Sequence, residues 1–314
     1  MSKKVLVIGS INMDVAISTE RRPRVGETVR GFGFMTNPGG SGANQATTVA
    51  KMGKEAWMLG CVGNDAYGKE LLSVLTGNGV KIDHIEKVDG VSTGVSVIIT
   101  DTKGGKSIVI DGGANKYVSV ELIKRSEDLI AQSDIVLLEL EIPFDTVRFA
   151  AQLAKKHGKT VILNPKPPEK LDDTFLKNID IIVPNDLSCG PICDMEITSI
   201  EDYKKASEYL YSKGVKHVIV NLGEKGALYY NGAEHKNILA PQVDPVDTTA
   251  AGDAFIGALT SMLSAGKSVE DAVEFANIVR AITVTLRGAQ KSIPSLAQVK
   301  DFCDKKGIRK EYIN

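Results

Sequence analysis

The sequence predicts an α/β fold in which a largely parallel β-sheet carries helices on both faces and a small accessory β-sheet lies beside it. Three observations support this prediction. Strands and helices alternate from Ser119 onward, short strand-like segments precede residue 112, and polar residues follow the buried strands. The chain has 314 residues, 43% apolar and 25% charged, with no linker or internal repeat, which predicts one domain spanning 1–314.

The N-terminal segment contributes a central strand. Val5–Ile8 is a short apolar run that is typical of a parallel strand buried on both faces. It delivers Asn12 and Asp14 to the sheet edge where open α/β sheets bind ligands. The next twenty residues contain proline and glycine without a helical period, and 28–34 alternates like a strand in a small exposed sheet.

A glycine-rich turn at 37–45 leads into a predicted helix over 46–52. Its spacing matches neither the P-loop nor the dinucleotide-binding fingerprint. Such a turn is explained equally by tight packing of the helix on the sheet. The amide side chain of Asn44, which we expect near the same strand ends as Asp14, favours a sugar or polyol site.

One helix and four more strands are predicted before residue 112. The helix covers 66–76, and the strands cover 57–62, 80–85, 94–100 and 106–111. The last two form a hairpin across the turn 101–105. Together with 28–34, the strands 80–85, 94–100 and 106–111 are expected to form an accessory sheet that covers the ligand site as a lid, with lid strands inserted at about 15–36 and 92–112.

The second half of the chain consists of repeated β–α units. Helices are predicted over 120–131, 145–156, 200–213 and 269–286, and strands over 135–140, 161–163, 179–183, 217–220 and 227–230. The turn at 222–226 is either a plain hairpin or a loop that holds nucleotide phosphates through backbone N–H groups. Polar residues end five strands, at Asn12, Glu141, Asn164, Asn185 and Asn221. Five at one sheet edge are more than turns require, so they predict a ligand site.

The stretch Asp247–Asp253 joins polar and small residues to a helix whose apolar face is formed by residues 254, 255, 258, 259, 262 and 263. N–H groups at a helix N-terminus bind anions. A carboxylate there repels an anion, so Asp253 makes sense as a base that removes a proton from a hydroxyl while the amides hold a phosphoryl group. The alternative is a simple N-terminal cap.

Composition excludes several classes of function. The net charge of −1 provides no basic field for nucleic acid. No apolar run approaches the roughly 20 residues needed to span a bilayer, so we expect a cytoplasmic protein without a membrane partner. The four cysteines are too few for a disulfide framework and are expected to be free thiols. The four histidines belong to no catalytic motif.

Taken together, eight stretches resemble the ribokinase-like (phosphofructokinase-B) family of carbohydrate kinases. They are 9–14, 26–28, 39–46, 140–141, 163–165, 184–185, 247–253 and 288–290, and they follow the family's order along the chain. The resemblance implies a doubly wound α/β domain with a β-sheet lid that often forms a homodimer. It also implies phosphoryl transfer from ATP to a sugar hydroxyl, first of all the 5-hydroxyl of D-ribose.

The resemblance also implies roles for individual residues. Asp253 matches the catalytic base, with the amides of Ala250, Ala251, Gly252 and Asp253 as the anion hole and Mg²⁺ arriving with ATP. The sugar-binding positions are Asn12, Asp14, Gly40, Ser41, Asn44, Glu141 and Asp253. The nucleotide positions are Asn185, Asn221, Gly223, Glu224, Gly226, Gly252 and Asn277. A monovalent cation, K⁺, matches Asp247, Thr249, Thr283, Leu286, Gly288 and Ser292, several of them through backbone carbonyls.

Two positions depart from the family pattern. The family usually carries lysine where this chain has Ser41, which puts the choice of sugar hydroxyls in question. It carries glutamate, which organises magnesium and phosphate, where this chain has Ser188, and 189–191 is a poor helix start. Two alternatives follow: a kinase for deoxyribose, a ketose or a nucleoside, or a sugar- or nucleotide-binding protein with weakened catalysis.

Overall fold

The computed structural model describes residues 3–103 and 105–308; Gly104, in the predicted turn 101–105, and the chain ends lie outside the described residues. The strands of the main sheet are β1 (Val5–Ile8), β4 (Ala56–Gly63), β5 (Lys81–Val88), β8 (Ile135–Glu139), β9 (Thr160–Asn164), β10 (Ile181–Ile182), β11 (His217–Asn221), β12 (Ala227–Tyr230) and β13 (His235–Ile238). Their order is β13-β12-β11-β10-β9-β8-β1-β4-β5. All neighbouring strands from β5 to β11 pair in parallel, whereas β12 pairs antiparallel with both β11 and β13.

The strand order reverses beside β1. From β1 the chain proceeds to β4 and β5 on one side, and then to β8 and the remaining strands on the other. The predicted doubly wound sheet is therefore confirmed. In such sheets the crevice at the reversal point binds ligands, and here it lies beyond the carboxyl ends of β1 and β8.

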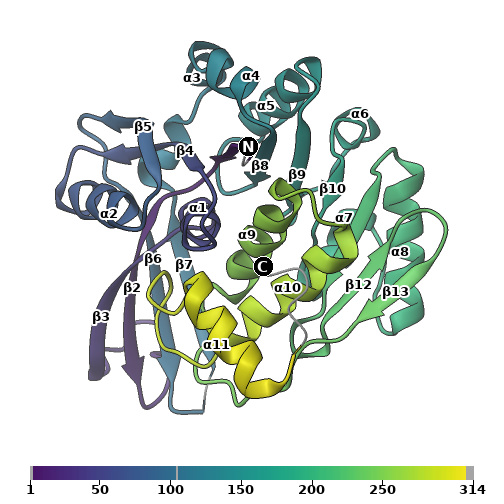
Figure 1. Cartoon of the computed structure of the whole chain (residues 1–314). Helices are drawn as coiled ribbons and strands as arrows, with labels where there is room; N and C mark the ends of the chain where they lie inside the picture. The colour runs from purple at the N-terminus through teal and green to yellow at the C-terminus, as the bar shows by residue number, and fades with distance from the viewer. Residues whose placement is uncertain (1–2, 104, 309–314) are drawn as a thin grey trace.

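Helices cover both faces of the main sheet (Figure 1). One face carries α1 (Ser41–Lys51), α2 (Ala66–Gly77), α9 (Ala251–Ser264), α10 (Val269–Thr283) and α11 (Leu296–Lys306). The other carries α3 (Val120–Arg125), α4 (Glu127–Gln132), α5 (Phe144–Lys156), α6 (Asp173–Leu176), α7 (Asp186–Cys193) and α8 (Ile200–Ser212). Successive residues of β1 alternate between two apolar cores, with Val5 and Val7 in one and Leu6 and Ile8 in the other.

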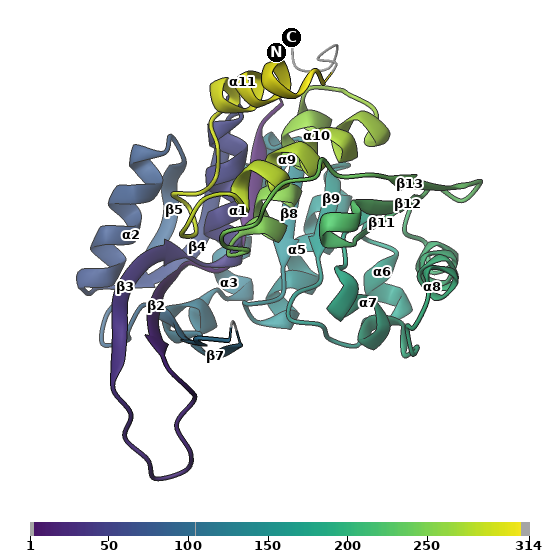
Figure 2. The ribbon, with the colours of Figure 1, turned by 90° about the horizontal axis from the view of Figure 1, so that it is seen from below.

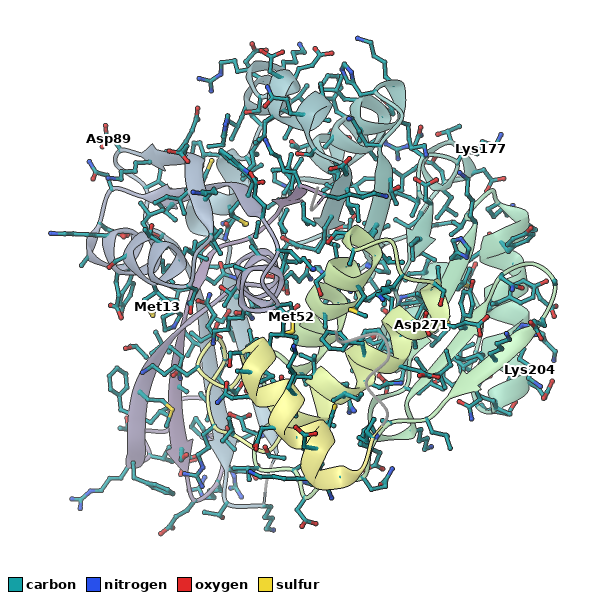
Figure 3. The ribbon with its side chains drawn as sticks, viewed as in Figure 1. Met13, Met52, Asp89, Lys177, Lys204 and Asp271 are labelled. Carbon is teal, nitrogen blue, oxygen red and sulfur yellow. The ribbon has the colours of Figure 1, made fainter. Side chains whose placement is uncertain are left out.

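Side chains follow the division between core and surface. Met13 and Met52 are buried within the first core, whereas Asp89 and Lys177 are exposed (Figure 3). No helix in the described part of the chain is long and apolar enough to cross a membrane. The four cysteines are free and buried, as predicted.

A second, four-stranded sheet forms the lid. Its strands are β2 (Asn12–Thr19), β3 (Gly31–Gly39), β6 (Gly94–Asp101) and β7 (Lys106–Asp111), in the order β3-β2-β6-β7. Figure 2 shows β2 and β3 extending away from the main body. The prediction missed β2 and put the neighbouring strand at 28–34. The strand predicted at 80–85 is β5, which pairs with β4 at the edge of the main sheet and not with the lid.

Several predicted boundaries are wrong for local reasons. Helix α1 begins at Ser41 and not at Ala46, and the predicted helix 120–131 is two helices, with Ser126 ending α3 and beginning α4. Helix α10 ends at Thr283, three residues earlier than predicted. The strand β13 and the helices α6 and α11 were not predicted.

Helix α7 corrects the expectation of a poor helix start. The Asn185 side chain accepts a hydrogen bond from the Ser188 N–H at 2.8 Å, and the Ser188 hydroxyl accepts one from the Asn185 N–H at 2.9 Å. This reciprocal capping box satisfies two N–H groups at the helix start. It supports a short helix despite Pro191.

A buried carboxylate, that of Asp180 just before β10, pairs with two lysines and gives a stability prediction. The Asp180 side chain is 6% exposed. Its carboxylate accepts hydrogen bonds from Lys155 Nζ at 2.7 and 2.8 Å and from the Val161 N–H at 2.9 Å. It also forms an ion pair with Lys216. Burial raises the pKa of Asp180, but these donors outweigh it and lower the pKa overall. We expect Asp180→Asn to reduce the free energy of unfolding at pH 7 by about 1–3 kcal/mol, because the partly exposed Lys155 and the buried Val161 N–H lose a charged acceptor.

Urea titration measures this effect, with Asp173→Asn as a control because the Asp173–Lys213 pair is solvent-exposed. The lowered pKa means that the stabilisation is present at neutral pH and is lost as pH falls through the pKa of the folded protein. Equal losses in the two variants at pH 7 would contradict the assignment.

Candidate active site

A cavity of about 280 Å³ lies where the lid meets the carboxyl ends of β1 and β8. All seven predicted sugar-binding residues line it. They are Asn12, Asp14, Gly40, Ser41, Asn44, Glu141 and Asp253. The lid contributes Ser96 and Ile98 from β6 and Ile108 and Ile110 from β7. We call this space the acceptor cavity.

The glycine-rich turn brings α1 against the chain that follows β1. Gly40 has a φ of 89°, and a Cβ atom there would lie 2.6 Å from the Asn12 nitrogen. Glycine therefore meets both the backbone conformation and the close approach. The Ala43 N–H then donates to the Ser10 carbonyl at 2.9 Å, which places Asn44 in the first turn of α1, facing α9.

Asp253 is buried and is held by side chains of α1. It is 6% exposed, and its two oxygens accept hydrogen bonds from Asn44 Nδ2 at 2.9 Å and Gln45 Nε2 at 3.2 Å. Burial raises its pKa, opposed by the charge of Lys166 and by the Asn44 and Gln45 amides. Asp253 is the third residue of α9, whose N-cap is Ala250 without a side-chain cap. The simple helix-cap alternative is therefore wrong.

The N-terminus of α9 presents open backbone donors to the same space. Ala250 has a φ of 60°, an uncommon conformation for a residue with a side chain. The Ala251 N–H is occupied by the Thr248 carbonyl at 3.2 Å. The N–H groups of Gly252 and Asp253 find no acceptor within residues 3–103 and 105–308, and a Cβ at Gly252 would meet nothing within 4 Å. Of the four predicted amides, only that of Ala251 has an acceptor within the described residues, so the others are free to receive an anion.

Glu141 is the centre of a polar network on the other side of the cavity. It accepts hydrogen bonds from Ser41 Oγ at 2.6 Å, Ser10 Oγ at 2.8 Å and Asn12 Nδ2 at 3.3 Å. Beneath it, the fully buried Glu139 accepts from the N–H groups of Ser10 and Glu141. Burial, reinforced by the charge of Glu141, raises the pKa of Glu139 to about 8.

Lys166 is a cavity residue that sequence reasoning missed. It follows Asn164-Pro165 at the end of β9, and its Nζ lies 3.4 Å from Ser41 Oγ and 3.8 Å from Glu141 Oε1. Proximity to Asp253 raises the pKa of Lys166, so the side chain is cationic at neutral pH. Its position one residue beyond a recognised strand-end motif was the available signal.

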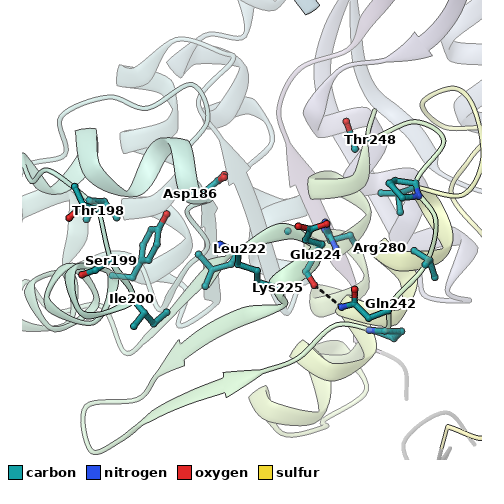
Figure 4. A pocket seen from close by; sticks show the side chains of 17 residues that line it. Asp186, Thr198, Ser199, Ile200, Leu222, Glu224, Lys225, Gln242, Thr248 and Arg280 are labelled. Atoms are coloured by element: carbon teal, nitrogen blue, oxygen red, sulfur yellow. Dashed lines mark hydrogen bonds between the residues drawn. The ribbon is translucent and has the colours of Figure 1, made fainter. Parts of the chain in front are cut away.

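A second cavity, of about 660 Å³, is shown in Figure 4. Two of the predicted nucleotide positions, Gly223 and Glu224, line it, and Thr248 lines both cavities. Asp186, Gln242 and Arg280 also line it and were not predicted. Thr248, just before α9, thus borders both cavities. We call it the donor cavity.

The other predicted nucleotide positions lie around the donor cavity and not among its lining residues. Asn185 and Asn221 are bridged side by side at the ends of their strands. The Asn221 side chain accepts from the Gly223 N–H at 3.1 Å, and Asn277 donates to the Ile238 carbonyl at 3.0 Å. Gly226, with a φ of 90°, closes the turn before β12. These side chains shape the loops that border the cavity.

Two loops meet beside α9 where a cation was predicted. Asp247 accepts from the Thr249 hydroxyl at 2.7 Å and from the Gly288 N–H at 3.1 Å, and the Val284 carbonyl accepts from the Asp247 N–H. Thr283 ends α10, and Leu286 lies in the loop that follows it. The Thr283 hydroxyl donates to the Val279 carbonyl, and the Ser292 hydroxyl donates to the Ala289 carbonyl. The structure thus brings 247–249 against 284–288.

Known proteins share this architecture and sequence. A model of the pfkB family carbohydrate kinases matches residues 2–296. The chain is 40% identical to a ribokinase of Schizosaccharomyces pombe, covering 94% of this chain and 96% of the relative. It is 35% identical to a deoxyribokinase of Salmonella typhi over 95% and 98%. The structure of Arabidopsis thaliana ribokinase complexed with ribose and ATP superimposes with a TM-score of 0.89 at 33% identity, covering 96% and 98%.

Proposed function

Because the chain belongs to the pfkB family of carbohydrate kinases, we propose that it transfers the γ-phosphoryl group of ATP to the 5-hydroxyl of D-ribose. One observation carries this proposal. The acceptor and donor cavities meet at Thr248, beside a buried carboxylate and two free N–H groups. In-line phosphoryl transfer requires this combination of an aligned hydroxyl and preorganised donors for the phosphoryl oxygens.

In the proposed mechanism, Asp253 accepts the proton of the attacking hydroxyl. The Gly252 and Asp253 N–H groups receive the phosphoryl oxygens at the positive end of α9. Asp14 and Glu141 accept hydrogen bonds from the other sugar hydroxyls. The lid residues Ile98 and Ile110 cover the sugar and exclude water from the reacting atoms.

Mg²⁺ accompanies ATP and neutralises phosphate charge. We infer that Asp186, which lines the donor cavity, faces this ion in place of the family's glutamate, whereas Ser188 is 2% exposed and serves the capping box. Asp186→Asn is expected to raise the Mg²⁺ concentration for half-maximal activity about tenfold, because such orienting contacts typically carry that much metal affinity. Initial rates across a Mg²⁺ titration measure it.

The matched control is Asp194→Asn. Asp194 is exposed, has a left-handed backbone conformation and lies at the opposite end of α7 from Asp186. Adding Ser188→Glu to Asp186→Asn should bring the Mg²⁺ requirement back toward that of the unchanged protein. A Mg²⁺ curve that Asp186→Asn leaves unmoved would remove Asp186 from this role.

We also place the monovalent cation at the paired loops 247–249 and 284–288, with ligands from Asp247, Thr249 and backbone carbonyls. K⁺ there would fix the loop that leads into the free N–H groups of α9. We expect kcat to rise when K⁺ replaces a bulky organic cation at constant ionic strength. Asp247→Asn should flatten this K⁺ dependence, because it removes charge and a Gly288 contact. A K⁺ response that survives the substitution would place the cation elsewhere.

We further infer a homodimer formed through the lid. Large apolar side chains are exposed on the lid strands, among them Phe34 at 66% and Val109 at 70% exposure. Apolar surface of this kind is usually covered by a partner. In this proposal residues 1–314 act as one kinase domain, with the lid supplying both the sugar cover and the interface.

A panel of acceptors tests the function. ATP is supplied with D-ribose, 2-deoxyribose, ketoses and nucleosides, and acceptor-dependent ADP formation is measured. The proposal predicts that D-ribose is the preferred acceptor. Turnover of another acceptor without turnover of ribose would favour the alternative that Ser41 suggests, and sugar binding by calorimetry without turnover at any Mg²⁺ concentration would favour a binding protein.

A further inference from the structure

The acceptor cavity contains an unusual arrangement of charge. Three carboxylates line it, those of Asp14, Glu141 and Asp253, and Lys166 is the one cationic side chain among the described lining residues. The Lys166 side chain comes from the loop after β9 and remains 50% exposed. Its Nζ lies near Ser41 Oγ, the position at which the family pattern carries lysine. A cation is therefore retained in the cavity but is attached to a different element.

The ammonium group of Lys166 has unused hydrogen-bonding capacity directed at the acceptor cavity. It has three N–H donors, and its one hydrogen bond within the described residues is a long contact of 3.4 Å to Ser41 Oγ. On its other side lies a cavity lined mainly by Ile110, Leu140, Ile142, Pro143 and Pro167. Among the described residues, the one carboxylate that lines this cavity is Glu141, which also lines the acceptor cavity and lies 3.8 Å from Nζ. The N–H groups of Nζ that Ser41 and Glu141 leave unused can therefore donate to a ligand in the acceptor cavity.

We propose that Lys166 binds the acceptor sugar directly, donating a hydrogen bond to a sugar oxygen between Ser41 and Glu141, and that it replaces the lysine that the family places at position 41. This inference rests on the proposed function and identifies a residue that determines the fit of the acceptor. The acceptor it suits is a neutral polyhydroxylated sugar, since the three carboxylates repel an anionic one.

Serine at position 41 is consistent with this exchange. A lysine at position 41 would bring a second ammonium group to within a few ångströms of Lys166, with a Coulomb cost that grows in a partly dry cavity. Serine instead donates to Glu141 at 2.6 Å and leaves space for Lys166. The two positions are thus coupled, and they should be exchangeable.

A double-substitution cycle tests the exchange. Lys166→Met keeps the length of the side chain and removes its charge and donors. We expect it to raise the KM for ribose about 10–100-fold, the loss expected for one hydrogen bond with a charged partner, and to leave the KM for ATP within twofold. Ser41→Lys alone should weaken ribose binding. The double variant, Ser41→Lys with Lys166→Met, should have a kcat/KM for ribose at least tenfold higher than that of Lys166→Met alone.

The pH profile supplies a second readout that a purely structural role would not move. The groups facing Lys166 are Asp253, Glu141, Glu139 and Asp14. Because Lys166 lowers the pKa of Asp253, Lys166→Met should shift the acid limb of kcat to higher pH. Lys116→Met is the control, because Lys116 lines the neighbouring apolar cavity but not the acceptor cavity.

A KM for ribose within twofold of the unchanged protein in Lys166→Met would overturn the inference. So would a weakened Lys166→Met variant that Ser41→Lys fails to rescue, since Lys166 would then not be equivalent to lysine at position 41. Failure of the proposed function has a different result, namely no ribose phosphorylation by the unchanged protein. In that case the same cycle is read from calorimetric binding of ribose.

Discussion

Asp253→Asn is expected to lower kcat by about 10²–10⁴, the usual contribution of a positioned general base. The substitution keeps the size of the side chain but removes its ability to take a proton from the attacking hydroxyl. The fold should tolerate the change. Asn44 Oδ1 and Gln45 Oε1 are buried without hydrogen-bond partners, so one of these amides can rotate to accept from the new NH2 group while the other still donates to the remaining oxygen.

Single-turnover rates and ribose binding distinguish loss of chemistry from loss of structure. The KM for ATP and the unfolding midpoint should stay near those of the unchanged protein. Thr260→Ser, a conservative change at a buried position of the same helix, is the control for helix integrity. A kcat for Asp253→Asn within threefold of the unchanged protein would show that the base has been misassigned.

Asp14→Ala is expected to weaken ribose binding about 10²–10³-fold, because two hydrogen bonds to a charged acceptor are lost in a water-poor site. Asp14 is 8% exposed, and burial raises its pKa to about 6, partly offset by a hydrogen bond from Ser96. Sugar binding that uses the carboxylate should therefore weaken as pH falls through about 6. Calorimetric titration of ribose between pH 5 and 8 measures both effects.

The same substitution should also remove the pH dependence itself. Ser96→Ala is the matched control, because it removes one donor to Asp14 but keeps the carboxylate, and it should shift the pH midpoint upward without the large loss of affinity. Ribose binding by Asp14→Ala that matched the unchanged protein would contradict direct recognition by this residue.

The elements with strong periodicity were predictable from sequence. Val5–Ile8 is apolar on both faces and is the central strand β1, and the alternation after Ser119 correctly predicts the parallel sheet. The acceptor residues were predictable for the same reason. Asn12 and Glu141 follow neighbouring parallel strands, so the topology of the sheet places them together once each strand is identified.

The features that were missed depend on contacts that no local pattern encodes. Strand β2 pairs with β3, the next strand along the chain, and with β6, which is far from it in sequence. Its mixture of polar and apolar residues has meaning only in that context. Helix α7 forms because Ser188 and Asn185 cap each other, which outweighs the unfavourable Pro191. The reach of the Lys166 side chain into the acceptor cavity follows from the position of β9 beside β8.

The central claim is that Asp253 activates the 5-hydroxyl of D-ribose for attack on ATP. The most direct measurement is ¹³C and ³¹P NMR of the product formed from ¹³C-labelled D-ribose, ATP and Mg²⁺. We predict D-ribose 5-phosphate and ADP in equal amounts, with carbon–phosphorus coupling at C5, and loss of this product in Asp253→Asn. ATP consumption without a sugar phosphate, or phosphate on any other oxygen, would contradict the account.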